Sequence, residues 1–179
     1  MNHIHPTAII YPNVHIGENV YIGAYSVIGA PPEHPDEVDP RDIDDNDYHV
    51  RGIHGVSIHD NTIIREHVTI NGGFINDTII GKNCYIMCHA HVGHDTIIGD
   101  NTTLHTSSVI GGHCQIETRC RIGLNATLHQ HTKLASGTMV GAQAFVKGYW
   151  NKPFRILAGV PAKDIGPNQR LIDKLGIVQ

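Results

Sequence analysis

The chain has 179 residues, of which 17% are charged, and its formal net charge is −4. This length is enough for a single domain with a sizeable core, and the charge gives no support for a partner that is nucleic acid or an anionic membrane surface. The start, MNHIHPTAII, lacks the basic and apolar regions of a signal peptide, and no stretch approaches the roughly 18 apolar residues of a membrane span. We therefore expect a cytoplasmic protein without membrane insertion.

Branched aliphatic residues recur at every sixth position along most of the chain. The first run is Ile4, Ile10, Ile16, Ile22 and Ile28, and the second is Ile58, Ile64 and Ile70. After four extra residues the third run is Ile80, Ile86, Val92, Ile98, Leu104, Ile110, Ile116, Ile122, Leu128, Leu134, Val140 and Val146. The residue two positions before each member of the third run is Thr, Ser, Cys or Ala. Since strand side chains alternate between two faces, the aliphatic and the small residue point the same way.

A period of six predicts short strands joined by turns, and such small units must stack on one another to bury their apolar faces. The pattern is similar to the hexapeptide repeat of the left-handed parallel β-helix, an all-β fold with three hexads in each triangular coil of 18 residues. The left hand is implied by this resemblance, because general connection rules favour a right-handed crossover. Three of the four cysteines, Cys84, Cys114 and Cys120, occupy the small inward position, so we expect reduced structural thiols.

Two segments interrupt the hexads. Residues 30–55 contain eight acidic residues and four prolines, which predict a protruding loop that is either solvated or reaches a neighbouring subunit or the acceptor. From residue 148 the repeat is lost, and a short helix is expected between Asn168 and Gly176. We therefore expect a β-helix domain over 1–147 and a C-terminal extension with a short helix over 148–179.

The coil of 18 residues gathers several polar residues at one corner. They are His94, Gly112 and Gln130 in one column, Asp95, His113 and His131 beside it, His129 one position earlier, and His91 on the adjacent outer strand face. Most of the fifteen histidines are expected to be solvated turn residues, but a histidine about 5 Å from a glycine N–H combines a general base with an oxyanion donor. Asp95 either orients His94 or is simply solvated.

Five stretches resemble UDP-N-acetylglucosamine acyltransferases, within the wider hexapeptide acyltransferases. They are IHPTAII at 4–10, IREHVTI at 64–70, IMCHAHVGHD at 86–95, GGHCQI at 111–116 and ATLHQH at 126–131. The resemblance implies a homotrimer with each active site between two chains. It implies His94 as catalytic base and Gly112 as oxyanion donor. It also implies substrate contacts from His91, His113, His129 and Gln130, while Asn71 stands where that family often has histidine.

The C-terminal part departs from that family. AGVPAKDI at 158–165 is similar to a loop of sugar acetyltransferases that use coenzyme A, and the helical bundle of the longer family is missing. The resemblance to UDP-N-acetylglucosamine acyltransferases puts Gly141 and Ala142 in an acyl channel. The resemblance to the acetyltransferase loop puts Lys163 at a coenzyme A phosphate. Arg155 belongs to the basic set that gives residues 147–179 a net charge of +4. That charge either favours a phosphate-bearing donor or is solvated.

The leading hypothesis is an acyltransferase that moves a short acyl group from coenzyme A to a hydroxyl or amine of a sugar in cell-surface polysaccharide or lipid A biosynthesis. We expect this sugar to be nucleotide-linked. No resident cofactor or metal is expected. One alternative is a long-chain, acyl-carrier-protein-dependent UDP-sugar O-acyltransferase. Another is a zinc enzyme of the γ-carbonic-anhydrase type that uses His89 and His94. A third is a non-catalytic β-helix scaffold.

Overall fold

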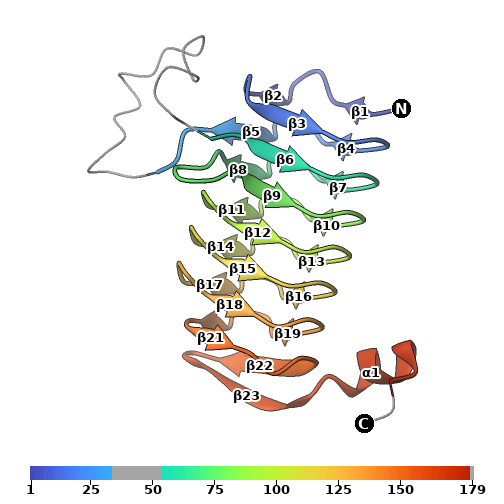
Figure 1. Ribbon diagram of the computed structural model, residues 1–179, viewed down its shortest axis with the longest axis vertical. Coiled ribbons are helices and arrows are strands. Elements are labelled where there is room, and N and C mark those ends of the chain that lie inside the picture. Colours follow the sequence, from blue (N-terminus) through green and yellow to red (C-terminus); the bar gives the residue numbers. More distant parts are fainter. Residues whose placement is uncertain (34–53, 178–179) are drawn as a thin grey trace.

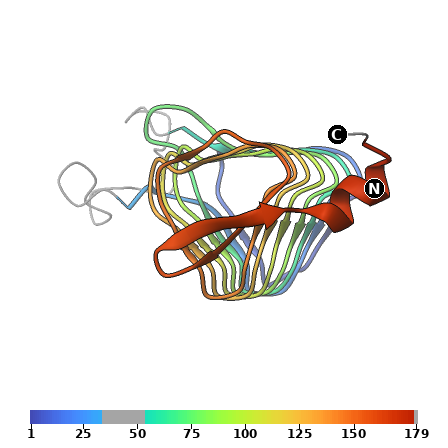
Figure 2. The ribbon, with the colours of Figure 1, turned by 90° about the horizontal axis from the view of Figure 1, so that it is seen from below.

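The chain forms a parallel β-helix, as the hexads predict, and its hand is left, as the resemblance implies. The computed structural model describes residues 1–33 and 54–177. The coils stack along one axis from β1 to β22, and the view along that axis shows a rounded triangle (Figures 1 and 2).

Three sheets form the three sides, and each coil contributes one strand to each sheet. Sheet A contains β1 (His3–Ile4), β4 (Tyr21–Ile22), β7 (Ile63–Ile64), β10 (Tyr85–Ile86), β13 (Thr103–Leu104), β16 (Arg121–Ile122), β19 (Met139–Val140), β22 (Arg155–Gly159) and β23 (Ala162–Pro167). Sheet B contains β2 (Ile9–Ile10), β5 (Val27–Ala30), β8 (Thr69–Asn71), β11 (His91–Val92), β14 (Val109–Ile110), β17 (Thr127–Leu128) and β20 (Phe145–Val146). Sheet C contains β3 (Val14–Ile16), β6 (Val56–Ile58), β9 (Thr78–Ile80), β12 (Ile97–Ile98), β15 (Gln115–Ile116), β18 (Lys133–Leu134) and β21 (Tyr149–Trp150).

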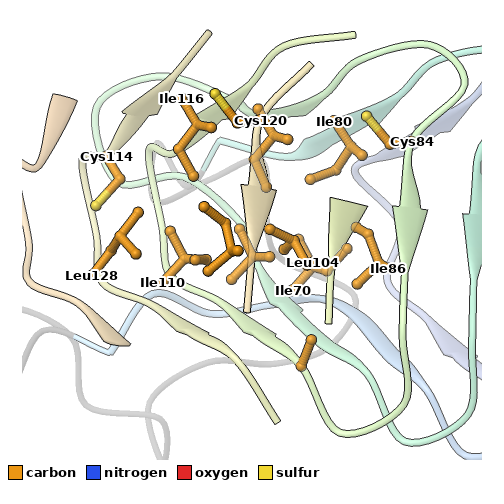
Figure 3. Packing of buried hydrophobic residues seen from close by; sticks show 14 of the residues in the cluster. Ile70, Ile80, Cys84, Ile86, Leu104, Ile110, Cys114, Ile116, Cys120 and Leu128 are labelled. Atoms are coloured by element: carbon orange, nitrogen blue, oxygen red, sulfur yellow. The ribbon is translucent and has the colours of Figure 1, made fainter. Parts of the chain in front are cut away.

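The core is a column of aliphatic side chains along the helix axis (Figure 3). All twelve aliphatics of the third run are at most 2% exposed, and so are the twelve small residues two positions earlier. Cys84 and Cys114 are among these small residues, and burial raises the pKa of each thiol to about 11. Cys120 is also buried, so all three cysteines predicted at the inward position lie in the core.

The corners are turns in which one residue adopts the left-handed αL conformation. Asn, Asp and His dominate these positions, because their side chains tolerate positive φ better than most. At the corner between sheets B and C the αL residues are Asp95, His113 and His131, with φ of 56°, 59° and 62°. The backbone of the repeat therefore places these three side chains in one column.

The coil continues beyond residue 147, which corrects the expected end of the regular repeat. Tyr149–Trp150 pairs with β18 and Arg155–Gly159 pairs with β19, both in parallel register. Leu157 fills the next core position and is fully buried, so the apolar column ends there. The chain then turns back as the antiparallel strand β23 and ends in α1 (Gln169–Leu175), which has Asn168 and Gly176 as its caps, as expected.

Of the acidic segment 30–55, residues 34–53 lie outside the described part of the chain. Ala30, the first residue of this segment, is also the last residue of β5. The next strand, β6, begins at Val56, directly after the last residue of the segment. In the described residues, no helix has the length and apolar character needed to cross a membrane.

Candidate active site

His94 and Asp95 form a hydrogen-bonded pair at the corner between sheets B and C. They follow β11, and the His94 Nδ1 lies 2.8 Å from the Asp95 Oδ2. The Asp95 side chain is 2% exposed and that of His94 is 14% exposed, so both groups are largely shielded from water. The sequence left open whether Asp95 orients His94, and the structure shows that the two are in contact.

The loop between β8 and β9 encloses the Asp95 carboxylate. Oδ1 accepts hydrogen bonds from Ile75 N and Asn76 N, both at 2.7 Å, and Oδ2 accepts one from Phe74 N at 2.9 Å. Burial opposes ionisation, but the hydrogen bonds from His94 and these three N–H groups outweigh it, so the Asp95 pKa lies below its ordinary value. The loop contains the four extra residues of the hexad count, whose contact with Asp95 the sequence did not reveal.

An ionised Asp95 fixes the tautomer of His94. A carboxylate can only accept hydrogen bonds, so the His94 Nδ1 must carry the hydrogen between them. In the neutral imidazole the lone pair is then on Nε2, at the far side of the ring. This is the arrangement that a general base requires.

Gly112 lies directly over the His94 ring, one coil further along the axis. A Cβ at this position would stand 2.8 Å from the His94 Nε2 and 3.0 Å from Cε1, so any side chain would collide with the imidazole. Within residues 1–33 and 54–177, the Gly112 N–H donates no hydrogen bond. Glycine therefore leaves both the ring and this N–H accessible to a third group.

His113 and His131 extend the corner along the axis. Their rings stack at 4.7 Å between centroids, and the His113 ring meets His94 edge-on at 4.8 Å. The His113 Nδ1 is 4.0 Å from the Asp95 Oδ2. One ligand atom from each of His94, Asp95 and His113 lies within 4.8 Å of the others, so these three residues could also hold a metal ion.

His91 lies on the outer face of sheet B, beside the corner. Its Nδ1 is 2.8 Å from the Thr69 Oγ1. Burial lowers the pKa of His91, the charge of Glu33 opposes this shift, and His94 adds to it. His91 therefore lies beside Thr69 of the neighbouring strand β8 and within reach of the charge of Glu33.

The other predicted substrate residues have local contacts. His129 and Gln130 are exposed one coil beyond Gly112, and the His129 Nδ1 lies 3.2 Å from the Gln130 carbonyl oxygen. Asn71 is buried, and its Nδ2 donates to the Pro31 carbonyl oxygen at 2.8 Å. In the structure, Asn71 therefore holds the start of the acidic segment against β8.

The four residues expected at the donor lie at the C-terminal end of the coil. Gly141 and Ala142 follow β19, and a Cβ on Gly141 would stand 3.3 Å from the Ala158 Cβ. Lys163 is exposed on β23. Arg155 donates to both carboxylate oxygens of Asp164, at 3.0 and 2.8 Å, so its charge is already paired.

The His89–His94 pair expected for a zinc site is not brought together. His89 follows β10 at the corner between sheets A and B, where its ring stacks on His67 at 4.9 Å. Strand β11 separates the two histidines and places them at different corners of the triangle. A spacing of five residues spans almost one hexad, which is one side of the coil.

A groove of about 720 Å³ runs along sheet C beside the corner. Its floor is a register column of outward residues on successive strands: Ile79, Ile97, Gln115, Lys133 and Tyr149. Asp95, His113 and His131 form one wall. The candidate site is therefore open to a ligand through this groove.

The model of the bacterial transferase hexapeptide family (six repeats) matches residues 1–30 and 77–112. The two matched segments cover less than half of the chain, and they include His94, Asp95 and Gly112.

Its relatives confirm the predicted resemblance to UDP-N-acetylglucosamine acyltransferases. An acyl-[acyl-carrier-protein]–UDP-N-acetylglucosamine O-acyltransferase from Bartonella henselae is 31% identical over 49% of this chain and 29% of its own length. The protein of the same name from Campylobacter lari is 34% identical over 56% of this chain and 49% of its own. The chain thus spans half or less of the length of these curated relatives.

Solved structures cover nearly the whole chain. A UDP-N-acetylglucosamine acyltransferase from Bacteroides fragilis superposes with a TM-score of 0.87 and 26% identity, over 99% of this chain and 66% of that one. The enzyme of the same name from Francisella novicida superposes with a TM-score of 0.74 and 26% identity, over 99% and 70%. The coil and its C-terminal hairpin therefore have counterparts in both solved structures.

Proposed function

We propose that this protein transfers an acyl group from a thioester to a hydroxyl of a UDP-linked amino sugar, with His94 as general base. The observation that carries the proposal is the His94–Asp95 pair, which the loop N–H groups hold in place and which lies under Gly112. This arrangement combines a base of fixed tautomer with an uncovered backbone N–H, and acyl transfer to a hydroxyl needs both.

An acyl carrier protein is the proposed donor. The names of the Bartonella and Campylobacter relatives specify acyl-[acyl-carrier-protein], and this supports the alternative donor over the coenzyme A expected from the AGVPAK loop. The paired charge of Arg155 also weakens the case for a coenzyme A phosphate at β22. The same names support UDP-N-acetylglucosamine, and oxygen rather than nitrogen, as the acceptor.

The proposed reaction begins when the His94 Nε2 removes the proton of the acceptor hydroxyl. The oxygen attacks the thioester carbonyl carbon, and the carbonyl electron pair moves onto oxygen, where the Gly112 N–H stabilises the charge. The tetrahedral intermediate then collapses, the carbon–sulfur bond breaks, and the thiolate takes the proton from His94. Asp95 stays ionised throughout and stabilises the imidazolium through the Nδ1–H.

We also propose a homotrimer in which the groove beside His113 lies between two chains. Apolar side chains on the outer strand faces support this proposal, since Ile97 is 42% and Val109 is 40% exposed in the single chain. Closed symmetry would cover these side chains.

The test of the base compares His94→Ala with His89→Ala, a histidine in an equivalent turn at another corner. His94→Ala should lower turnover about 10²–10⁴-fold, the usual contribution of a general base, without unfolding the protein. His89→Ala should retain the wild-type rate. Equal turnover in folded His94→Ala and wild type would remove His94 from the mechanism.

A second candidate function is metal-assisted hydrolysis, favoured by the close ligand atoms of His94, Asp95 and His113. The hydrogen bonds that Asp95 accepts from three backbone N–H groups count against it, because they occupy the lone pairs that a metal would need. Acyl transfer should survive treatment with a strong chelator. Loss of activity on chelation, with rescue by zinc, would favour the metal enzyme.

A further inference from the structure

The groove along sheet C changes character from one end to the other. On its floor, Ile79 and Ile97 give way to Gln115, Lys133 and Tyr149, while the wall passes from Asp95 to His113 and His131. The floor is therefore apolar at the N-terminal end, and donor groups lie at the C-terminal end. A ligand that binds along the groove would meet the donors just beyond the catalytic corner.

The carboxylates that line the groove are already hydrogen-bonded within the chain. Asp95 accepts the hydrogen bonds of the loop and of His94. Asp77 accepts from Gly55 N at 2.9 Å and lies 3.7 Å from the His54 Nδ1. Neither carboxylate is therefore positioned to neutralise a cation further along the groove.

Lys133 is the cation on the floor of this groove, and among the described residues it forms no ion pair with a carboxylate. Lys133 is exposed, its Nζ lies 5.3 Å from the centroid of the Tyr149 ring, and no carboxylate of the described residues lies within ion-pair distance. His131 is also exposed, and its described contact is the stack on His113. Because His131 is in a turn and Lys133 is on the next strand, their side chains approach the same end of the groove from its wall and its floor.

We propose that His113, His131 and Lys133 bind a phosphate ester of one of the two substrates. Lys133 would supply the charge, and the stacked imidazoles would donate hydrogen bonds from the wall. The proposal rests on the proposed function for its two possible ligands, the diphosphate of the UDP-sugar and the phosphodiester of the pantetheine arm. Both are phosphate esters, and the experiment separates them.

The experiment measures equilibrium binding of UDP and of 4′-phosphopantetheine by calorimetry, without turnover. Its variants are Lys133→Gln and His131→Asn, since Asn tolerates the αL conformation of this turn. The matched controls are Arg121→Gln, an exposed cation on the outer face of sheet A, and His89→Asn, an αL histidine at another corner. Arg121→Gln removes a cation, and His89→Asn removes an αL imidazole, each from a different face of the coil.

Lys133→Gln should weaken the binding of one probe about tenfold, or about 1.4 kcal/mol. His131→Asn should weaken the same probe severalfold, and both controls should bind like the wild type. A loss confined to UDP would place the acceptor diphosphate in the groove, and a loss confined to 4′-phosphopantetheine would place the donor arm there.

Unchanged affinities in both variants would overturn the proposal. An equal loss in the controls would do the same, as would wild-type protein that binds neither probe at millimolar concentration. If the wild type bound a probe through Lys133 but transferred no acyl group, the proposed function alone would be refuted. Conversely, acyl transfer with wild-type KM values in Lys133→Gln would refute this subsite alone.

Discussion

Asp95 is the residue on which the corner depends, because a single carboxylate connects the loop to the base. Four groups donate to it, and its side chain is 2% exposed. Its hydrogen bonds hold the carboxyl group ionised, so its pKa is lower in the folded chain than in the unfolded one. Its contribution to stability is therefore complete above the unfolded pKa, about 4, and is lost as the pH falls through the folded pKa.

Asp95→Asn should lower the free energy of unfolding by about 1–3 kcal/mol at pH 7, because the amide cannot accept all the hydrogen bonds and its own N–H groups face donors. The difference from wild type should shrink as the pH falls below about 4, because the carboxyl group becomes protonated in the unfolded wild-type chain while the folded chain still holds it ionised. Urea unfolding of both proteins at pH 7 and at pH 3 measures this. A constant difference across that range would show that ionisation of Asp95 has no part in stability.

Gly112→Ala tests the close approach of the next coil to His94. The new Cβ would lie 2.8 Å from the Nε2, and the ring cannot move away without losing its hydrogen bond to Asp95. Turnover should fall at least tenfold, while the melting temperature changes by only a few degrees, because the residue lies at a turn outside the core. Wild-type turnover in the folded variant would contradict the proposed place of the reacting atoms.

At the scale of elements, the hexads predicted nearly all of the coil. From Ile80 to Val146 each predicted core position is buried, because a repeat of fixed length leaves only one register in which every aliphatic points inward. The six-residue spacing did not predict the coil after residue 147, where Gly148 and Pro153 interrupt the hexads. The strands there still pair with the preceding coil, and Leu157 still fills the core.

The hydrogen bonds from the loop between β8 and β9 to Asp95 could not be predicted from the sequence. The hexad spacing revealed four extra residues, but the direction of their backbone N–H groups leaves no signal in the sequence. Their convergence on Asp95 depends on the fold of the loop, in which a Cβ at Gly73 would overlap the Asn76 carbonyl oxygen. The coil length of 18 residues predicted that His94 and Gly112 lie in one column. The hydrogen-bond partners of Asp95 could be identified only from the structure.

Ile75→Pro tests the loop through the loss of one N–H donor, and Ile75→Ala, which keeps that donor, is its matched control. The Ile75 side chain is 58% exposed, so neither change removes core packing. Ile75→Pro should lower turnover about tenfold, since a hydrogen bond to a charged group contributes about 1.5 kcal/mol or more. Equal rates in the two variants would show that the loop does not support the base.

At the scale of the whole molecule, the flat outer faces of the three sheets predict self-association. Light scattering at micromolar concentration should give a mass three times that of the 19.6 kDa chain. Substitution of Ile97 by Glu on the outer face of sheet C should reduce this mass if the face lies between chains, whereas Arg121→Glu on sheet A serves as its control. A monomeric mass for the wild type would refute the trimer and the placement of the groove between two chains.

The most direct test of the central claim is the reaction itself. Purified protein receives UDP-N-acetylglucosamine with either a 3-hydroxyacyl carrier protein or acetyl-coenzyme A, and mass spectrometry follows the nucleotide-sugar. We expect a product that is heavier by one acyl group, formed efficiently from the carrier protein and lost in His94→Ala. Absence of acylated nucleotide-sugar with both donors, or its undiminished formation by His94→Ala, would contradict the proposed acyl transfer.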